Sequence, residues 1–473
     1  MPIIKKIQNR FRSSKDETLK VPARFMRPRM ILILIVLALS IFGCVMIYSA
    51  HSIVSMEQRQ NPAVMGIAQF RYLLIGLVIA YGISRVDYHF FTSKPVILFG
   101  WFLVIGVLTF TILKGRSAKG ATRWLQIGGI TLQPSEFAKI YFIVLGTYCI
   151  SFIQDSTKYK EQIRCGLAFV FVLIPLLLIL KQPDKGGTAI IAGTLLIMLL
   201  YSGIVDFKGF GIASAIGAVA ILVLSFSTEY SRQRIDALFH PMEHRFGISY
   251  QIVQGRIAFG SGGLFGVGIG QGGSKYSYLP EAHNDFILAV IGEECGLIGT
   301  LAVVAAFCII LYCAYDIAKN ANDKKGMLVA SGAGTILMLQ FMLNAGGELG
   351  LIPLSGKPIP FLSYGGSSLL TSMALFGLIW SVSVHSKLPE TEHDRLRGSM
   401  SVASANGSST RRSQTNDFTV ISGGADTRRS SRTDTRRSSR RESRTSSSRP
   451  SRRDTRAKNT NLNGRSNDRN KHR

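Results

Sequence analysis

Ten separate apolar runs, each about as long as a membrane is thick, constrain this chain of 473 residues more than any other feature. A helix needs about 20 predominantly apolar residues to cross the hydrocarbon core of a bilayer. The runs lie at residues 31–50, 67–84, 95–113, 134–153, 164–180, 187–204, 209–227, 285–315, 326–345 and 365–385. The sequence therefore predicts an all-α integral membrane protein with about ten transmembrane helices. A long extracytoplasmic loop, at about 228–284, is expected between the seventh and eighth helices.

The formal net charge of +27 is unevenly distributed along the chain. Residues 1–30 hold nine Lys and Arg against two acidic residues, and residues 387–473 hold 22 against nine. The 356 residues between them hold 24 against 17. A nucleic-acid-binding enzyme would be expected to spread basic charge over a folded face, so this distribution argues against a nucleic-acid partner. It predicts three segments: a basic cytoplasmic N-terminal segment (1–30), a ten-helix membrane domain (31–386) and a disordered Ser/Arg-rich cytoplasmic tail (387–473).

The basic N-terminal segment also predicts the orientation of the spans. The positive-inside bias holds this segment in the cytoplasm, and an even number of spans returns the tail to the same side. Two outside loops then depart from the bias, because the third-to-fourth connection carries Arg116, Lys119 and Arg123 and the long loop carries Lys275 among other basic residues. A long loop translocates regardless of its charge, which accounts for the second loop and not for the first. We expect an external anionic ligand.

Ionisable residues inside the spans narrow the search for a site, since each costs roughly a few kcal/mol unless it is paired or faces a wet cavity. Glu136 and Lys139 are three positions apart and can pair on one helical face. A helix-orienting ion pair and a direct substrate role both stay open for them. Asp285 has no basic residue three or four positions away. A carboxylate at the external mouth of a helix bundle, beneath a basic loop, is a candidate general base.

The cysteines indicate neither a disulfide framework nor a zinc site. Five of the six lie in or at the edge of apolar runs, Cys295 lies in a helical one, and no Cys-x-x-Cys pair is present. His283 and Asp285 suggest a metal pair at first sight, but no second cluster of ligands accompanies them. We therefore expect no metal site in the protein itself.

Four stretches are too rich in Gly, Pro and polar residues to be ordinary connections. They are Lys119-Gly-Ala-Thr-Arg-Trp124 with Gln133-Pro-Ser-Glu-Phe-Ala-Lys139; Gln182-Pro-Asp184; the run 260–273 leading into Tyr278-Leu-Pro-Glu-Ala-His-Asn-Asp285; and Pro358-Ile-Pro-Phe-Leu-Ser-Tyr-Gly-Gly-Ser-Ser368. In this order along ten spans, they closely resemble the SEDS family (shape, elongation, division and sporulation) over about residues 30–386. Glu281-Ala-His283 and Gly356-Lys-Pro-Ile-Pro-Phe361 are more similar to its division branch, FtsW, than to its elongation branch, RodA. Pro183-Asp-Lys-Gly-Gly-Thr188 departs from the family pattern by a charge and an extra Gly.

The resemblance implies a glycosyltransferase that polymerises lipid II into glycan strands at the extracytoplasmic membrane face during septal cell-wall synthesis. By resemblance, Asp285 is the general base that deprotonates the 4-hydroxyl of the acceptor sugar, which displaces the pyrophosphate of the donor. The expected substrate-binding residues are Arg116, Lys119, Arg123, Trp124, Gln133, Ser135, Glu136, Lys139, Asp184, Lys275, Glu281, His283, Ser363, Tyr364 and Ser367.

The resemblance also implies partners and a location. The expected partners are lipid II, a class B penicillin-binding protein with transpeptidase activity, and cytoplasmic and membrane division proteins. No cofactor is expected, although a divalent cation could bridge the substrate pyrophosphate. The expected location is the bacterial cell membrane at the division septum, as a multi-pass protein with both termini cytoplasmic. A lipid II transporter, an elongation-type polymerase and a noncatalytic scaffold that recruits a transpeptidase stay open as alternatives.

Two low-complexity regions have their own interpretations. The run 260–273 is superficially similar to a nucleotide-binding loop, but no strand precedes it and no Lys-Ser/Thr follows in the required order. A mobile external loop that closes over substrate fits its glycines better. The tail repeats Asp426-Thr-Arg-Arg-Ser-Ser431 at Asp434-Thr-Arg-Arg-Ser-Ser439. It either attracts anionic lipid headgroups or docks cytoplasmic division proteins under the control of phosphorylation.

Overall fold

The computed structural model describes residues 23–386, apart from 58, 60, 119–120, 128–129, 156–157, 227–228, 244–245, 248 and 277–278. All of these residues lie in the first of two units into which the chain divides, Met1–Ser399. The predictions made for residues 1–22 and for the tail 387–473 lie outside the described residues.

Each of the ten predicted apolar runs falls on one long helix. These helices are α2 (Ala23–Glu57), α3 (Val64–Arg85), α5 (Lys94–Lys114), α6 (Pro134–Gln154), α7 (Lys158–Lys181), α8 (Lys185–Tyr201), α9 (Phe207–Phe226), α12 (Ile287–Lys319), α13 (Lys324–Glu348) and α14 (Gly366–His385). Among the described residues, nine helices are long and apolar enough to cross a membrane, and α8 is apolar but only 17 residues long. The predicted helical membrane architecture is confirmed, and α2 begins earlier than its apolar run.

A small antiparallel sheet departs from the all-α prediction. Its strands, in the order β1 (Arg116–Ala118), β2 (Ala121–Ile127) and β3 (Ile130–Leu132), fill the connection between α5 and α6. Arg116 pairs with Trp124, and Gln126 pairs with Thr131. The segment Ala121–Ile127 contains Thr, Trp, Leu and Ile, which favour the pleated surface of a strand, and Gly residues lie on both sides of it. The all-α class therefore describes the membrane bundle, and this connection adds a small sheet that was not predicted from the sequence.

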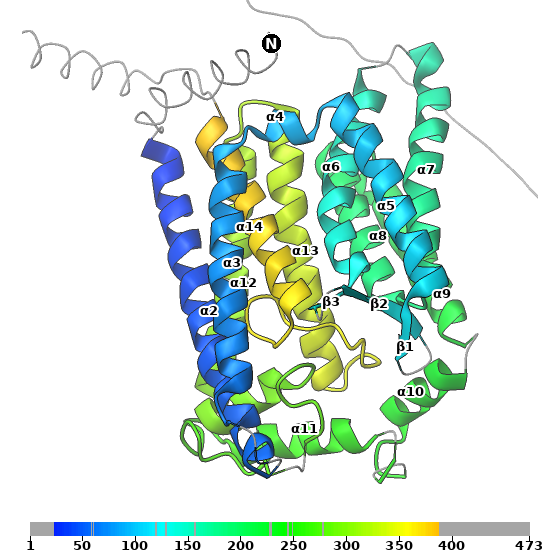
Figure 1. The fold of residues 1–473 in the computed structure, drawn as a ribbon. Helices are drawn as coiled ribbons and strands as arrows, with labels where there is room; N and C mark the ends of the chain where they lie inside the picture. Colours follow the sequence, from blue (N-terminus) through cyan, green and yellow to red (C-terminus); the bar gives the residue numbers. More distant parts are fainter. Residues whose placement is uncertain are drawn as a thin grey trace, which may run out of the picture. The chain divides into compact units, whose positions relative to one another are not determined.

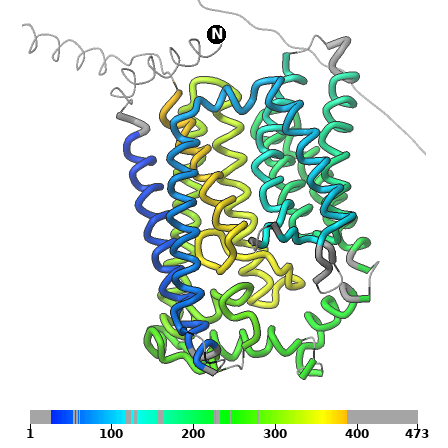
Figure 2. Tube along the Cα trace, viewed as in Figure 1, coloured from blue at the N-terminus to red at the C-terminus, as the bar shows by residue number. Residues whose placement is uncertain are grey.

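The elements between the spans gather at the two ends of the bundle. Helix α2 begins and helix α14 ends at the upper end in Figure 1, together with the short helix α4 (Tyr88–Phe91). The sheet and the short helices α10 (Glu229–Phe239) and α11 (Tyr250–Ser261) lie at the lower end, as the trace in Figure 2 also shows. The four motifs singled out in the sequence meet toward this lower end.

Small residues let α3 and α14 pack closely. A Cβ atom on Gly377 would lie 2.9 Å from the Ala80 backbone, and one on Gly76 would lie 2.7 Å from the Met373 side chain. Membrane helices associate through such close packing, because lipid offers no hydrophobic driving force between them. Helices α13 and α14 are mostly buried, whereas the apolar segment of α9 has no buried residue. The interior of the bundle therefore lies around α13 and α14.

Helix α12 is interrupted at Gly296, where the backbone angles are φ 71° and ψ −167°. A Cβ atom there would lie 2.4 Å from the Gly266 nitrogen and 2.5 Å from the Leu264 oxygen, so only glycine fits. The Gly-rich loop uses the backbone groups that this interruption exposes: Leu297 donates to the Gly263 carbonyl at 2.9 Å, and Val267 donates to the Glu293 carbonyl at 3.0 Å. The loop is thus packed against the first third of α12.

Candidate active site

Asp285 lies at the end of the loop before α12 and is partly exposed. Its backbone oxygen accepts a hydrogen bond from Nδ2 of Asn344 on α13, at 3.1 Å. The segment between α13 and α14 passes beside its carboxylate: Gly356 has a φ of +63°, and a Cβ atom there would lie 3.5 Å from Asp285 Oδ2. A glycine at this position lets the backbone turn next to the carboxylate without covering it.

The residues just before Asp285 form a polar neighbourhood with two other elements. The Tyr364 nitrogen donates to the His283 carbonyl at 2.9 Å, and Asn284 Nδ2 donates to Glu281 Oε2 at 2.7 Å. The His283 ring lies 4.7 Å from the ring of His51 on α2 and 5.8 Å from that of Tyr364. Burial, with a smaller contribution from His51, lowers the pKa of His283 to about 4, although Glu281 opposes the shift. His283 is therefore neutral near pH 7.

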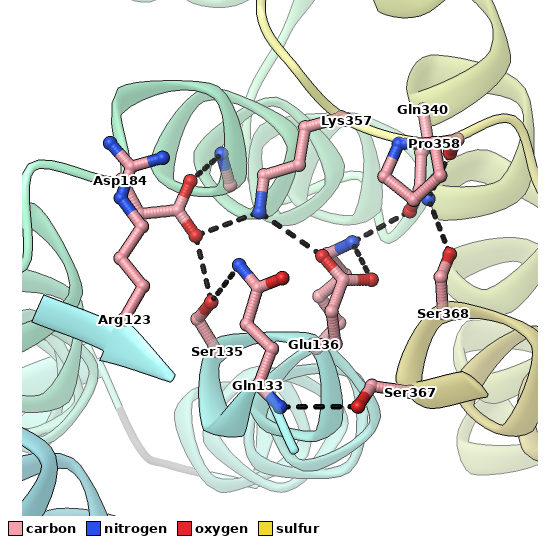
Figure 3. Close-up of polar contacts among 12 residues, drawn as sticks. Arg123, Gln133, Ser135, Glu136, Asp184, Gln340, Lys357, Pro358, Ser367 and Ser368 are labelled. Atoms are coloured by element: carbon pink, nitrogen blue, oxygen red, sulfur yellow. Dashed lines mark hydrogen bonds and ion pairs between the residues drawn. The ribbon is translucent and has the colours of Figure 1, made fainter. Parts of the chain in front are cut away.

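Four buried charged side chains contact one another, and we call them the central charge cluster: Glu136, Lys139, Asp184 and Lys357. Figure 3 labels Glu136, Asp184 and Lys357 among them. Lys357 Nζ donates to Asp184 Oδ2 at 2.7 Å and to Glu136 Oε1 at 3.1 Å. Lys139 Nζ donates to Glu136 Oε2 at 2.7 Å and to Gln340 Oε1 at 2.6 Å. Each of the four is at most 1% exposed. Buried charges need such pairing, because an unpaired one pays the full cost of leaving water.

Asp184 is the anchor of one side of this cluster. As the N-cap of α8, it accepts from the Gly187 nitrogen at 3.0 Å through Oδ1, and it accepts from Ser135 Oγ at 2.7 Å through Oδ2. Burial alone would raise the pKa of Asp184, but the charges of Lys357 and then Arg123 outweigh burial and hold this pKa below its ordinary value. Asp184 is thus a carboxylate at any physiological pH.

Helix α6 and the sheet reach the same place from the other side. Arg123 on β2 donates through Nε to the Gln182 carbonyl at 3.0 Å and through Nη2 to the Pro183 carbonyl. The Gln133 nitrogen, just before α6, donates to Ser367 Oγ at 3.1 Å. The sheet is therefore tied to the turn between α7 and α8, and the start of α6 to the start of α14.

The structure brings most of the predicted site residues together in two adjoining groups. The first surrounds Lys357 and contains Arg123, Gln133, Ser135, Glu136, Lys139, Asp184 and Ser367. The second adjoins Asp285 and contains Glu281, His283, Ser363 and Tyr364. Trp124 lies on β2, next to Arg123. Lys119 and the side chain of Arg116 lie outside the described residues.

Lys275 lies in a different place, in what we call the loop cluster, made of Ser274, Lys275, Glu293 and Glu294. Its ammonium lies 3.9 Å from Glu294 Oε1 and donates to the Gly270 carbonyl. Glu293 accepts from the nitrogens of Gly273 at 2.8 Å and of Ser274 at 3.2 Å. These contacts attach the end of the Gly-rich loop to α12. The ammonium of Lys275 pairs with the Glu294 carboxylate within this cluster.

Sequence reasoning missed three residues that hold the site together: Lys357, Asn344 and Gln340. Gln340 Nε2 donates to the Pro358 carbonyl at 2.7 Å, and Asn344 Nδ2 donates to the Lys357 carbonyl at 2.8 Å. Two features of the sequence could have indicated these three residues. Lys357 is the lysine in a short Gly-Lys-Pro connection between two apolar runs, and Asn344 and Gln340 are amides four positions apart within a span.

An apolar cavity of about 480 Å³ adjoins the cluster on the far side of α6. Gly100 and Val104 of α5, Ala138 and Tyr141 of α6, and Leu125 and Leu132 of the sheet are among the residues that line it. Pro134 also lines it, between Gln133 and Ser135 of the polar site. Within the part of the chain that the structure describes, no group of three or more His, Cys, Asp or Glu side chains could hold a metal ion.

The chain is similar to a well-defined set of proteins. Residues 29–388 match the family model for cell cycle proteins of the FtsW, RodA and SpoVE type. A probable peptidoglycan glycosyltransferase FtsW from Trichlorobacter lovleyi is 38% identical over 376 residues, covering 79% of this chain and 97% of that relative. Stage V sporulation protein E of Bacillus subtilis is 33% identical over 366 residues, covering 76% and 98%.

Solved structures share the fold at lower sequence identity. The rod shape-determining protein RodA of Thermus thermophilus aligns with a TM-score of 0.55 and 22% identity, over 76% of this chain and 97% of that one. A chain from a structure titled as a peptidoglycan synthase complex that coordinates polymerization and crosslinking aligns with a TM-score of 0.59 and 21% identity, over 75% and 98%.

Proposed function

Because this chain belongs to the FtsW, RodA and SpoVE family of cell cycle proteins, we propose that it is a peptidoglycan glycosyltransferase that polymerises lipid II into glycan strands. The observation that carries the proposal is the position of Asp285. Its carboxylate lies beside Gly356, the residue next to Lys357 of the central charge cluster. A partly exposed carboxylate thus lies beside a buried, charge-balanced cluster in a membrane bundle.

The reaction joins two sugars and expels a pyrophosphate. Asp285 accepts the proton of the 4-hydroxyl of the acceptor N-acetylglucosamine as its oxygen attacks C1 of the donor N-acetylmuramic acid. The bond between C1 and the pyrophosphate oxygen breaks on the opposite face, so the configuration at C1 inverts. General-base catalysis of this kind typically contributes about 10²–10⁴-fold to the rate.

The leaving pyrophosphate needs cations, and the polyprenyl chain needs an apolar path. Arg123 extends from the sheet toward the turn that holds Asp184, and stabilising the departing charge there would contribute at least as much as the base. The cavity between α5, α6 and the sheet offers apolar lining a few residues from the polar site. A divalent cation held by the substrate pyrophosphate itself would supplement Arg123 without needing a protein metal site.

The partners and the location follow from the same proposal. The fold is shared with a chain from a peptidoglycan synthase complex, and we propose that this protein also acts with a class B penicillin-binding protein. Relatives named FtsW support a role at the division septum. The start of α2 and the end of α14 lie at one end of the bundle, which supports two cytoplasmic termini and a catalytic face at the opposite side.

Purified full-length protein with its transpeptidase partner and fluorescent lipid II in vesicles tests this function. We expect glycan strands longer than the disaccharide, resolved on a gel. If the labelled lipid instead changes leaflet and no strand forms, the protein is a transporter and the proposal is wrong. Imaging a tagged copy tests the division role separately, because an elongation-type enzyme would label the side wall.

A further inference from the structure

We propose that Lys357 is a positioning residue that holds the Asp285 carboxylate in its catalytic position. Through its ion pairs, Lys357 makes this position depend on the charges of Glu136 and Asp184. The proposal rests on the glycosyltransferase function proposed above and adds to it a specific coupling within the site. Lys357 touches neither substrate nor reacting atoms in this scheme, because its ammonium is taken up by two protein carboxylates.

The side chain of Lys357 supplies the first part of the argument. It is 1% exposed and bridges two elements, Glu136 on α6 and Asp184 at the start of α8. Lys139 already binds the other oxygen of Glu136. Lys357 therefore completes the charge balance: two lysines face two carboxylates, and one of the lysines comes from the segment between α13 and α14.

The backbone of Lys357 supplies the second part. Nδ2 of Asn344 donates to the Lys357 carbonyl at 2.8 Å and to the Asp285 carbonyl at 3.1 Å. Asn344 is 1% exposed, and its helix α13 is mostly buried. One amide group thus joins the chain segment that carries the cation to the residue that carries the proposed base.

The neighbours of Lys357 make this link short and stiff. Gly356 has a left-handed backbone and lies next to the Asp285 carboxylate. The Pro358 carbonyl accepts from Gln340 Nε2 at 2.7 Å, and the proline ring fixes its own φ. Segment 356–358 is therefore held by the charge cluster through the Lys357 side chain, and by α13 through Asn344 and Gln340.

Removing the charge of Lys357 should release this link. Asp184 and Glu136 would then carry excess negative charge in a buried site, which favours rearrangement of the segment. A displacement of about 1 Å at a catalytic group can cost on the order of 100-fold in rate. Lys357 does not line the apolar cavity, and Arg123 keeps its own hydrogen bonds to the Gln182 and Pro183 carbonyls, so the loss should appear in kcat more than in KM.

The test uses full-length protein with its transpeptidase partner, and compares Lys357→Met, Lys357→Gln, the double variant Lys357→Met with Asp184→Asn, and the exposed-lysine control Lys324→Met. We expect the single Lys357 variants to lower kcat at least 10-fold with KM within about threefold. The double variant should recover at least threefold over Lys357→Met, because it removes the unpaired carboxylate as well. Lys324→Met should match the wild type.

Hydrogen exchange of the amides at 286–290 provides a readout that needs no activity, and it should rise in Lys357→Met. A kcat within twofold of the wild type in both single variants, or an unchanged kcat with a raised KM, would overturn the proposal. So would a double variant no better than the single one. If the wild type forms no strands while exchange still rises, the coupling stands and the glycosyltransferase function fails. Lys357→Gln covers the case in which the Met variant does not fold.

Discussion

Two buried charge clusters among the described residues are built differently. In the central charge cluster, two lysines and two carboxylates contact one another at 2.7–3.1 Å. In the loop cluster, the single ammonium of Lys275 lies 3.9 Å from Glu294, and Glu293 is satisfied by backbone N–H groups. Within the described residues, Oε2 of Glu294 has no hydrogen-bond partner.

The difference indicates two different tasks. The central charge cluster joins segments that are far apart in the sequence, since Lys357 contacts residues 173 and 221 positions away, and it borders Asp285. The loop cluster joins α12 to the Gly-rich loop just before it, with Ser49 of α2 as a further contact at 2.6 Å from Glu294 Oε1. Perturbing the first should change both catalysis and stability, whereas perturbing the second should change mainly stability.

The largest expected effect on stability comes from breaking the ion pair of Lys139 with Glu136 in the central charge cluster. Lys139→Met leaves Glu136 without one of its two ammonium partners in a site that is 0% exposed at Lys139. We expect a loss of about 3–5 kcal/mol in the free energy of unfolding, since the two buried carboxylates of the cluster would then share the single ammonium of Lys357. Chemical unfolding in mixed micelles measures it, with Lys324→Met as the matched control. A loss below about 1 kcal/mol would mean that the pair behaves like a surface ion pair.

The pH dependence of folding stability should distinguish the segment around His283 from the two charge clusters. The pKa of His283 is lowered to about 4, below its unfolded value of about 6.5. Its contribution to stability is therefore complete above pH 6.5 and is lost as the pH falls toward 4. When the pH falls from 7 to 5, we expect the free energy of unfolding to decrease by about 1–2 kcal/mol more in the wild type than in His283→Asn.

The central charge cluster should contribute nothing to that pH difference. The pKa of Asp184 is lowered and that of Lys357 is raised, the latter by Asp184 and Glu136 acting against burial, so both stay charged from pH 5 to pH 7. Thermal unfolding across this range is the measurement. Equal slopes for the wild type and His283→Asn would show that His283 is protonated as easily in the folded state as in the unfolded state.

The smallest expected effect is in the loop cluster. Ser49→Ala removes the hydrogen bond to Glu294 Oε1 and should cost about 1 kcal/mol of stability. The rate of strand formation per folded molecule should be unchanged, because Asp285 and its contacts are untouched. A rate loss greater than the stability loss explains would remove the distinction between the two clusters.

The sequence predicted the helices well and the contacts between them poorly, for a physical reason. An apolar run of about 20 residues is a local property that lipid enforces directly, so each run became a helix. The sheet was missed because its strands are only three to seven residues long. The same segment also carries Arg116, Lys119 and Arg123, and only their charge was considered in the prediction. The ion pair of Glu136 with Lys139 follows from helical spacing, and the structure contains it.

The position of Lys357 could not be read in the same way. Its two carboxylate partners lie on elements whose packing depends on the whole bundle, and neither local spacing nor hydropathy encodes that packing. The motif Pro183–Thr188 contains its own lysine, Lys185, directly after Asp184. Nothing in that motif predicts that Lys357, from the segment before α14, contacts the Asp184 carboxylate. Asn344 was hidden for the same reason, since its role depends on two backbone carbonyls from separate segments.

The most direct test of the central claim is the rate at which Asp285→Asn forms glycan strands from lipid II, relative to the wild type. Asn keeps the size of the side chain and removes its ability to accept a proton, so the account predicts a loss of at least about 100-fold. Asp206→Asn, an exposed Asp-to-Asn change at the start of α9, should keep the wild-type rate. Strand formation by Asp285→Asn within twofold of the wild type, in protein of equal thermal stability, would contradict the assignment of Asp285 as the general base.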